Sequence, residues 1–462
     1  MNKNVISPLD GRYAKRTIPL LKYFSEGALA QYRIKVEIQY LIALSKLNIG
    51  IKKFSKKEIE FLESIYNLSE KDLKIISDIE LKGYGKIKAT DHDVKAIEYF
   101  IKEKIKSSSL SKLIEWIHFA LTSEDTNNIA YSLMQRDSLE DVIIPKINEI
   151  IKKFEYLAKK YKNLSMLART HGQPASPTTF GKEMKVFANR LKKQLQILSS
   201  VQIYAKLNGA TGNWNAHFIS FPQINWITFS KNFINSFNKR NKVLLKPNCI
   251  TTQIENHDSY IEIFDSLKRL NSILIDFDQD IWRYISDEWI GQQVKKGSVG
   301  SSTMPHKINP IKFENSEGNL GIANSFFEFF ARKLPISRLQ RDLSDSTVLR
   351  NVGVAFAHSY IGYEYLLDGL SRIEVNKQKI KETLLNHPEV IAEAIQTILR
   401  KEGYKIPYEL LRELTQGKRI TQNDFDVFID KLEIRSDLKA ELKKITPHSY
   451  KGLSERIVYE GI

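Results

Sequence analysis

The sequence predicts an all-α protein whose centre is a bundle of long helices. Three segments, residues 143–161, 180–202 and 260–284, carry apolar side chains at steps of three and four. That spacing places the side chains on one face of a helix. Each segment runs to about twenty residues or more, longer than a usual globular helix, whereas alternating strand-like runs are scarce. Long helices with apolar seams need partner helices, so we expect a bundle that is shared between subunits.

The three seams define the expected helices in chain order. The first consists of Ile143, Ile147, Ile150, Phe154, Leu157 and Tyr161. The second consists of Phe180, Met184, Phe187, Leu191, Leu195 and Leu198. The third consists of Phe264, Leu267, Leu270, Leu274, Phe277, Ile281 and Tyr284. Pro177, after Ser176, is typical of the first turn of a helix and predicts that the second helix begins there.

Shorter helices and more frequent turn signals flank the central segments. They predict three helical domains, over residues 1–110, 111–373 and 374–462, of which the middle one contains the long helices. The best candidate strand is short and covers residues 242–245.

Composition narrows the class of protein. The chain has 462 residues, 42% hydrophobic and 27% charged, and it contains no apolar run of membrane-spanning length. Its one cysteine, Cys249, excludes a disulfide framework and a cysteine-based zinc site. The sequence therefore predicts a soluble, cytoplasmic protein.

The formal net charge of +16 has two interpretations. It is compatible with a nucleic-acid partner, or it reflects lysines spread over solvated helix faces, as at 159–160 and 192–193. No basic stretch is interleaved with aromatic residues as a base-stacking surface requires, which favours the second interpretation. A positive field would also attract a small substrate that carries phosphate and carboxylates.

Several common catalytic motifs are absent from the sequence. There is no G-x-x-x-x-G-K-[ST] loop, no G-x-G-x-x-G after a strand, no G-x-S-x-G and no H-E-x-x-H. A metal site or a dinucleotide site is therefore not expected.

The most informative stretch runs over residues 297–319 and reads G-S-V-G-S-S-T-M-P-H-K-I-N-P-I-K-F-E-N-S-E-G-N. It begins as a polar, glycine-containing loop with few core-forming residues. Its serines, lysine and asparagines suit the binding of carboxylates and amides. Composition alone leaves two interpretations open, a flexible surface loop and a binding segment.

This stretch resembles the signature of the fumarase/aspartase superfamily, and its continuation is similar to the branch that acts on adenylosuccinate. Further segments resemble that branch in the same order along nearly the whole chain. They are D-G-R-Y (10–13), D-H-D-V-K-A-I-E-Y-F (91–100), T-S-E-D (122–125), R-T-H-G-Q-P-A (169–175), T-T-Q-I-E (251–255), R-D-L-S-D-S-T-V-L-R (341–350) and P-Y-E-L-L-R-E-L-T-Q-G-K-R (407–419).

The resemblance implies elimination of fumarate from adenylosuccinate, giving AMP, and from the succinylaminoimidazole-carboxamide ribotide. It implies no metal and no organic cofactor. It also implies a homotetramer whose central helices form a shared bundle and whose active sites each draw residues from three chains. No specific nucleic acid and no membrane are expected as partners.

The resemblance also assigns the catalytic roles. Ser301 is implied as the base that removes the carbon-bound proton, with Ser302 as a neighbour that spacing alone does not separate from it. His171 is implied as the general acid, oriented by Glu314, and imidazole suits this role because its pKa lies near neutral pH. The groups implied to stabilise the carboxylates and their developing charge are Lys307, Asn309, Thr122, Ser123 and Gln253.

The nucleotide is expected to be bound by a second set of residues. Those implied to donate to the phosphate are Arg12, Tyr13, Arg341, Ser346 and Arg350. His92 resembles a phosphate- or ribose-side residue. The remaining residues expected to bind substrate are Asp91, Asp93, Asn315 and Thr347. Asp91 stands where the family usually has Asn, and it adds a carboxylate beside an anionic nucleotide.

Two alternatives remain at this stage. The first is another lyase of the superfamily, such as argininosuccinate lyase, fumarase or aspartase, which share the serine loop but not the blocks at 12–13 and 91–93. The second is a basic helical nucleic-acid-binding protein, against which the presence of Ser301, His171 and Lys307 argues.

Overall fold

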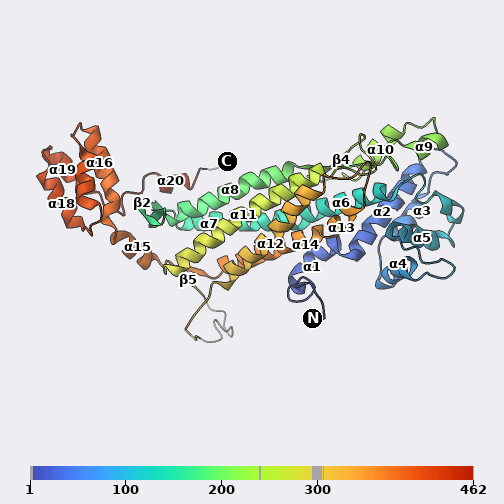
Figure 1. Ribbon diagram of the computed structural model, residues 1–462, viewed down its shortest axis with the longest axis horizontal. Helices are drawn as coiled ribbons and strands as arrows, with labels where there is room; N and C mark the ends of the chain where they lie inside the picture. Colours follow the sequence, from blue (N-terminus) through green and yellow to red (C-terminus); the bar gives the residue numbers. More distant parts are fainter. Residues whose placement is uncertain (1–3, 239–240, 294–303, 305, 461–462) are drawn as a thin grey trace. The chain divides into compact units, whose positions relative to one another are not determined.

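The computed structural model describes residues 4–238, 241–293, 304 and 306–460. It is predominantly helical, and its strands occur only as short pairs in the part described (Figure 1). The predicted all-α class is therefore confirmed. The chain gathers into two compact units. Unit 1 comprises 1–147, 194–272 and 318–364, and unit 2 comprises 148–193, 273–317 and 365–462. The division into three domains stays a prediction.

Five long helices contain the boundaries between the units. They are α7 (Ile144–Lys160), α8 (Phe180–Ser200), α11 (Asp258–Ser286), α12 (Ile311–Lys333) and α14 (Val352–Leu370). The first three coincide with the three apolar seams of the sequence, so these predicted helices are confirmed.

In its described residues, unit 1 also contains thirteen shorter elements. They are α1 (Ala14–Phe24), α2 (Glu26–Leu44), α3 (Lys56–Ser64), α4 (Glu70–Leu81), α5 (Asp93–Ile105), η1 (Ser111–Trp116), α6 (Ser123–Ser138), η2 (Leu139–Ile143), β3 (Gln202–Ala205), α9 (Asn215–Ser220), α10 (Trp226–Asn235), β4 (Leu244–Pro247) and α13 (Ser344–Leu349). Strands β3 and β4 pair in parallel, and β4 begins two residues later than the predicted strand.

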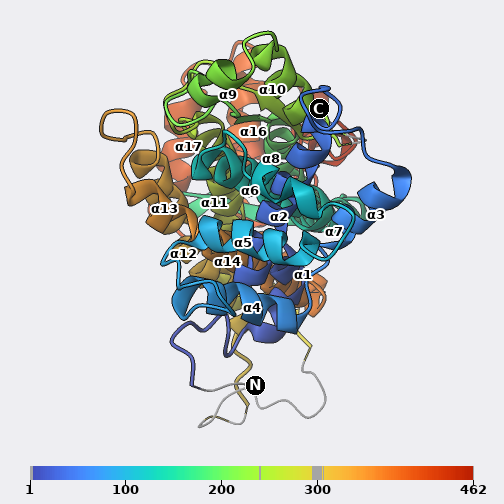
Figure 2. The same ribbon diagram turned by 90° about the vertical axis from the view of Figure 1, so that its right-hand side faces the viewer.

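Helix α2 is the central element of this part of unit 1. It packs against α1, α3, α5 and α6, and α4 covers α5 in turn (Figure 2). Its side chains are buried almost all round, with Ile34, Val36, Ile38 and Tyr40 fully inaccessible. Two of its charged side chains, Arg33 and Glu37, are buried, and they pair with Asp93 and His118.

Aromatic rings form the core between the long helices of unit 1. The ring centroids of Phe264 on α11 and Phe327 on α12 are 5.6 Å apart, and those of Phe327 and Phe356 on α14 are 5.9 Å apart. All three rings are fully buried. Burial of one such ring contributes roughly 1.5–3 kcal/mol of transfer free energy.

Unit 2 has a corresponding aromatic core between α7, α8, α11 and α12, which lie side by side (Figure 1). The ring of Phe277 on α11 lies 4.7 Å from Phe154, 5.2 Å from Phe187 and 6.1 Å from Phe313, measured between centroids. Phe154, Phe187 and Phe277 are seam residues of the sequence, so the predicted packing between these three helices is confirmed.

The other elements of unit 2 are short. They are β1 (Ser165–Thr170), β2 (Gln173–Thr179), β5 (Ile290–Gln292), β6 (Ile373–Val375), α15 (Lys377–Leu385), η3 (Pro388–Ile391), α16 (Ala392–Lys401), α17 (Pro407–Thr415), α18 (Gln422–Lys431), α19 (Ser436–Leu442) and α20 (Ser454–Ile457). Both strand pairs, β1–β2 and β5–β6, are antiparallel.

The start predicted for the second long helix was wrong. Pro177 lies in β2, and α8 begins only at Phe180. The register of β1 and β2 shifts between Met166 and Ala168, so that Ser176 and Pro177 together oppose one residue of β1. A bulge leaves a residue outside the hydrogen-bond ladder, where the missing N–H of proline costs nothing.

Among the residues that the structure describes, none of the helices has both the length and the apolar character needed to cross a membrane.

Candidate active site

The first group of predicted site residues surrounds the beginning of α5 in unit 1. Asp93 accepts hydrogen bonds from Arg33 at 2.8 Å and from Arg350 at 2.7 Å. Burial opposes ionisation of Asp93, but the charges of Arg33 and Arg350 hold its pKa below the ordinary value. Arg350 also lies 3.6 Å from Glu26. The structure thus pairs two predicted residues, Asp93 and Arg350, and adds a second partner of Asp93, the buried Arg33, that the sequence did not indicate.

The two residues before Asp93 set the direction of the chain into α5. His92 is the N-cap residue, and its Nδ1 accepts a hydrogen bond from the backbone N–H of Lys95 at 3.2 Å. Asp91 is exposed and has a φ of +46°. Asn and Asp are the non-glycine residues that most readily adopt this left-handed conformation, so Asp91 preserves the backbone geometry that an Asn would have.

The second group lies at the beginning of α6. Thr122 is its N-cap and Ser123 its first residue, so the free N–H groups of the helix lie beside both hydroxyls. Asp125 accepts from the backbone N–H of Thr122 at 3.0 Å and lies 3.0 Å from the ammonium group of Lys206, both side chains being fully buried. Such a helix N-terminus suits the binding of a carboxylate.

A third group adjoins the second through Glu124. Arg341 donates to the side-chain oxygen of Gln253 at 3.1 Å and lies 3.2 Å from the buried carboxylate of Glu124. The amide nitrogen of Gln253 donates to the carbonyl of Ala210 at 2.9 Å, so both ends of the Gln253 amide are held. Burial raises the pKa of Glu124, and Arg341 opposes that rise.

The remaining predicted residues of unit 1 occupy two segments. Ser346 and Thr347 lie on α13, and Arg350 directly follows that helix. Tyr13 is the N-cap of α1, and Arg12 beside it is exposed. Within the described part of the chain, no hydrogen bond or ion pair joins Arg12 to the groups above.

His118 is a candidate that the sequence reasoning missed. It lies four residues before Thr122, and its Nδ1 is 2.7 Å from the carboxylate of Glu37 on α2. Thr126 donates to the same carboxylate oxygen at 2.6 Å. Burial lowers the pKa of His118, but the carboxylates of Glu37, Glu98 and Asp125 together raise it, so the net shift is upward. The signal available in the sequence was a histidine just before the T-S-E-D segment.

In unit 2, His171 occupies the tip of the β1–β2 hairpin. His171 and Gly172 connect the paired residues Thr170 and Gln173, and they have φ values of +52° and +74°. Two consecutive positive φ values are what a two-residue type I′ turn requires. Arg169 donates to the carbonyl of Gly172 at 3.2 Å, and the side chain of His171 is exposed. The imidazole of His171 is therefore accessible at the hairpin tip.

The predicted residues after the serines lie at the start of α12 and just before it. Lys307 is exposed and Asn309 half-buried, whereas Glu314 and Asn315 belong to the first turns of α12. Within the described part of the chain, Glu314 accepts from the indole N–H of Trp282 at 3.3 Å and not from His171. Its pairing with His171 stays a prediction. Ser301 and Ser302 lie outside the described residues.

Residues of the C-terminal part of unit 2 form hydrogen bonds with both strands of the hairpin that carries His171. Ser176 in β2 and Tyr450 both donate to one carboxylate oxygen of Glu393 on α16, the latter at 2.8 Å. Ser165 in β1 donates to the carbonyl of His448 at 3.0 Å. Glu393 is therefore a positioning residue for the hairpin.

We expect Glu393→Ala to lower kcat about tenfold with little change in KM or in thermal stability, because a displaced acid is poorly aligned. Steady-state kinetics and thermal unfolding check this. Glu393→Gln keeps an acceptor oxygen and should restore most of kcat, and Glu389→Ala, one turn away, is the matched control. Equal losses in Glu389→Ala would contradict the role of Glu393.

No group of three or more His, Cys, Asp or Glu side chains in the described residues is arranged to hold a metal ion. The three groups of predicted residues in unit 1 have in common cationic side chains and hydrogen-bond donors that contact anionic oxygens.

Comparison with known proteins defines the class. A lyase family model matches residues 11–323, and a model for the adenylosuccinate lyase C-terminal region matches residues 337–451. The solved structure of a fumarate lyase from Mesorhizobium sp. BNC1 has the same fold, with a TM-score of 0.73 at 17% identity over 95% of this chain and 96% of that one. The protein is thus a lyase with the fold of the fumarase/aspartase superfamily.

Two relatives identify the family within that class. The adenylosuccinate lyase of Dictyostelium discoideum is 48% identical over 98% of this chain and 97% of its own. That of Haemophilus influenzae is 46% identical over 98% and 97%. The chain belongs to the adenylosuccinate lyase family.

Proposed function

We propose that the protein eliminates fumarate from adenylosuccinate to give AMP, and from the succinylaminoimidazole-carboxamide ribotide to give the free carboxamide. The observation that carries this proposal is 48% identity to an adenylosuccinate lyase over 98% of the chain. The grouping of arginine, glutamine and helix N-terminal donors in unit 1 supports it, because both substrates carry a phosphate and two carboxylates.

The elimination needs two proton movements. Ser301 takes the proton from the carbon next to a carboxylate, and His171 protonates the departing nitrogen as its bond to carbon breaks. The electron pair left on carbon spreads into the neighbouring carboxylate and then forms the double bond of fumarate. Lys307 and Asn309 supply the positive charge and donors where the negative charge develops, and Glu314 orients His171.

Thr122, Ser123 and Gln253 bind the carboxylates of the succinyl group in this proposal. The helix N-terminus beside Thr122 and the held amide of Gln253 are preorganised for that task, so little ordering is required on binding. The residues assigned to the nucleotide are Arg12, Tyr13, Asp91, His92, Asp93, Asn315, Arg341, Ser346, Thr347 and Arg350.

The assay for this function is spectrophotometric fumarate release from adenylosuccinate, from the ribotide and from argininosuccinate. We expect turnover of the first two and none of the third. Release from argininosuccinate alone would assign the protein to another branch of the superfamily.

Arg350→Ala should raise KM by about 10- to 100-fold and change kcat little, since a phosphate contact is made equally in the ground and transition states. The substitution also leaves the Asp93 carboxylate with Arg33 as its one remaining arginine partner, next to the bound phosphate. Initial rates against substrate concentration measure both constants. Arg338→Ala, which removes an exposed arginine paired with Asp342, is the control. A large fall in kcat at unchanged KM would contradict the phosphate role.

We also propose a homotetramer with active sites built from three chains. The exposure of His171 on a hairpin tip supports this, because a general acid needs surrounding groups that exclude water and align it. Within the described part of one chain, Glu314 accepts a hydrogen bond from Trp282 and none from His171. The carboxylate expected to orient His171 is therefore not supplied by the same chain in this proposal.

Complementation tests the shared sites. His171→Ala and Ser301→Ala subunits are each inactive alone. When they are dissociated and reassembled one to one, about a quarter of the sites should regain both residues if these come from different chains. Fumarate release by the mixed oligomer measures this. Well-mixed tetramers that stay inactive would place both residues in the same chain.

A further inference from the structure

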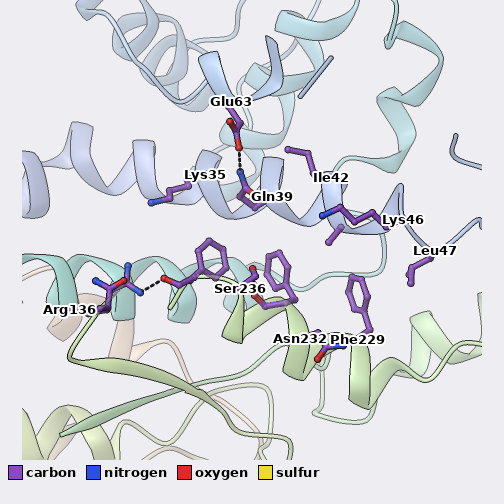
Figure 3. A pocket seen from close by; sticks show the side chains of 14 residues that line it. Lys35, Gln39, Ile42, Lys46, Leu47, Glu63, Arg136, Phe229, Asn232 and Ser236 are labelled. Atoms are coloured by element: carbon purple, nitrogen blue, oxygen red, sulfur yellow. Dashed lines mark hydrogen bonds between the residues drawn. The ribbon is translucent and has the colours of Figure 1, made fainter. Parts of the chain in front are cut away.

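A cleft of about 550 Å³ lies in unit 1 between α2 and α10 (Figure 3). None of its lining residues belongs to the candidate active site. One wall is a face of α2 with Lys35 and Gln39 along it, continued by Lys46 just after the end of the helix. The opposite wall comes from α10 and the turn after it. The volume falls in the range of small-molecule sites, roughly 300–1,000 Å³.

The cleft contains a lysine that has no salt-bridge partner among the described residues. Lys35 is half-buried, and its ammonium group lies 5.7 Å from the ring of Tyr32. Within the described residues it forms no ion pair. Burial lowers the pKa of Lys35, and Arg136 adds to this effect; the carboxylates of Asp137 and Glu63 act in the opposite direction without offsetting it. A bound anion would supply the ion-pair partner that Lys35 lacks.

Other charges define which end of the cleft attracts an anion. Arg136 is already committed, with hydrogen bonds to Asp137 at 2.8 Å and to the carbonyl of Phe237 at 2.8 Å. The one carboxylate of the lining is Glu63, which accepts from Gln39 at 2.9 Å. Figure 3 shows Glu63 on the far side of Gln39 from Ser236, with its carboxylate bonded to the Gln39 amide. The lining therefore carries three cationic side chains, Lys35, Lys46 and Arg136, against the carboxylate of Glu63, and Asp137 lies beside Arg136.

The wall facing α2 is aromatic. Phe229 and Phe233 are stacked at 6.3 Å with an interplanar angle of 7°, and Phe237 meets Phe233 edge-on at 5.2 Å. Phe237 is half-exposed, so its ring offers apolar surface to a ligand. Asn232 is exposed on the same wall and can both donate and accept hydrogen bonds.

We propose that this cleft binds a nucleotide at a second site, with its phosphates beside Lys35 and its base on the aromatic wall beside Asn232. An unpaired cation, an exposed ring and a side-chain amide match a phosphate, a flat ring and the polar edge of a base. The inference is independent of the function proposed for the active site. The same helix carries Arg33 and Glu37, so a ligand here contacts the helix that holds Asp93 and His118.

Calorimetric titration of the full-length oligomer with ATP tests the site. The Arg350→Ala protein is used, because its active site binds phosphate weakly. We expect one ATP per chain to bind, and inorganic pyrophosphate to bind more weakly because it lacks the ring. Lys35→Gln in that background should weaken ATP binding about tenfold or more, as expected for a lost charge-assisted contact.

Two further variants keep the test decisive. Asn232→Asp places a carboxylate on an exposed position of the wall, so it should fold normally and also weaken ATP binding. Lys57→Gln removes an exposed lysine of α3 outside the cleft and is the matched control. The proposal is overturned if the Arg350→Ala protein binds no ATP. It is equally overturned if neither cleft variant weakens binding, or if Lys57→Gln weakens it as much as Lys35→Gln.

Discussion

Ser301→Ala is expected to lower kcat by about 10²- to 10⁴-fold while KM changes little. Removal of the proposed proton-transfer group slows the step that generates the carbanion, whereas the groups proposed to bind phosphate and carboxylates are untouched. Lys307 lies six residues further along the chain, in the segment that leads into α12. In the proposed mechanism it supplies positive charge where negative charge develops. Fumarate release at saturating and at limiting substrate separates the two constants.

Ser302→Ala is the matched control for this prediction. It removes the same hydroxyl from the adjacent position and should retain most of kcat. The opposite result, near-normal Ser301→Ala and inactive Ser302→Ala, would assign the base to Ser302. Substrate binding by inactive Ser301→Ala, measured by calorimetry, should stay within a few-fold of the native protein.

The second large effect concerns stability. Asp125→Ala is expected to cost about 3–5 kcal/mol, since it leaves the fully buried Lys206 ammonium without its carboxylate. The same carboxylate accepts from the backbone N–H groups of Thr122, Asn208 and Gly209, which would also lose their acceptor. Chemical denaturation at fixed protein concentration measures the loss.

The double variant Asp125→Ala/Lys206→Met distinguishes a stranded charge from a simple loss of packing. Replacement of a buried pair by apolar side chains costs less than removal of one partner. The double variant should therefore be more stable than Asp125→Ala alone. If it is less stable, the cost comes from the backbone donors and the cavity, and the charge of Lys206 is not the main cause.

The sequence by itself determined three of the five long helices in the described part of the chain, and the family. A 3.6-residue period is a local property, so the seams of α7, α8 and α11 were readable without knowledge of their neighbours. The serine-containing stretch and the other matching segments are likewise continuous runs of residues. The comparisons confirmed the family that they indicated.

The tertiary structure alone decided which charged groups meet. Arg350 and Asp93, separated by 257 residues, share an ion pair, and Glu37 holds His118 over 81 residues. Local periodicity carries no information about such pairings, because they depend on how α2, α5 and α6 pack. Pro177 was misplaced for the same reason: its neighbours favoured a helix start, but pairing with β1 drew it into a bulged strand that presents His171 at an exposed tip.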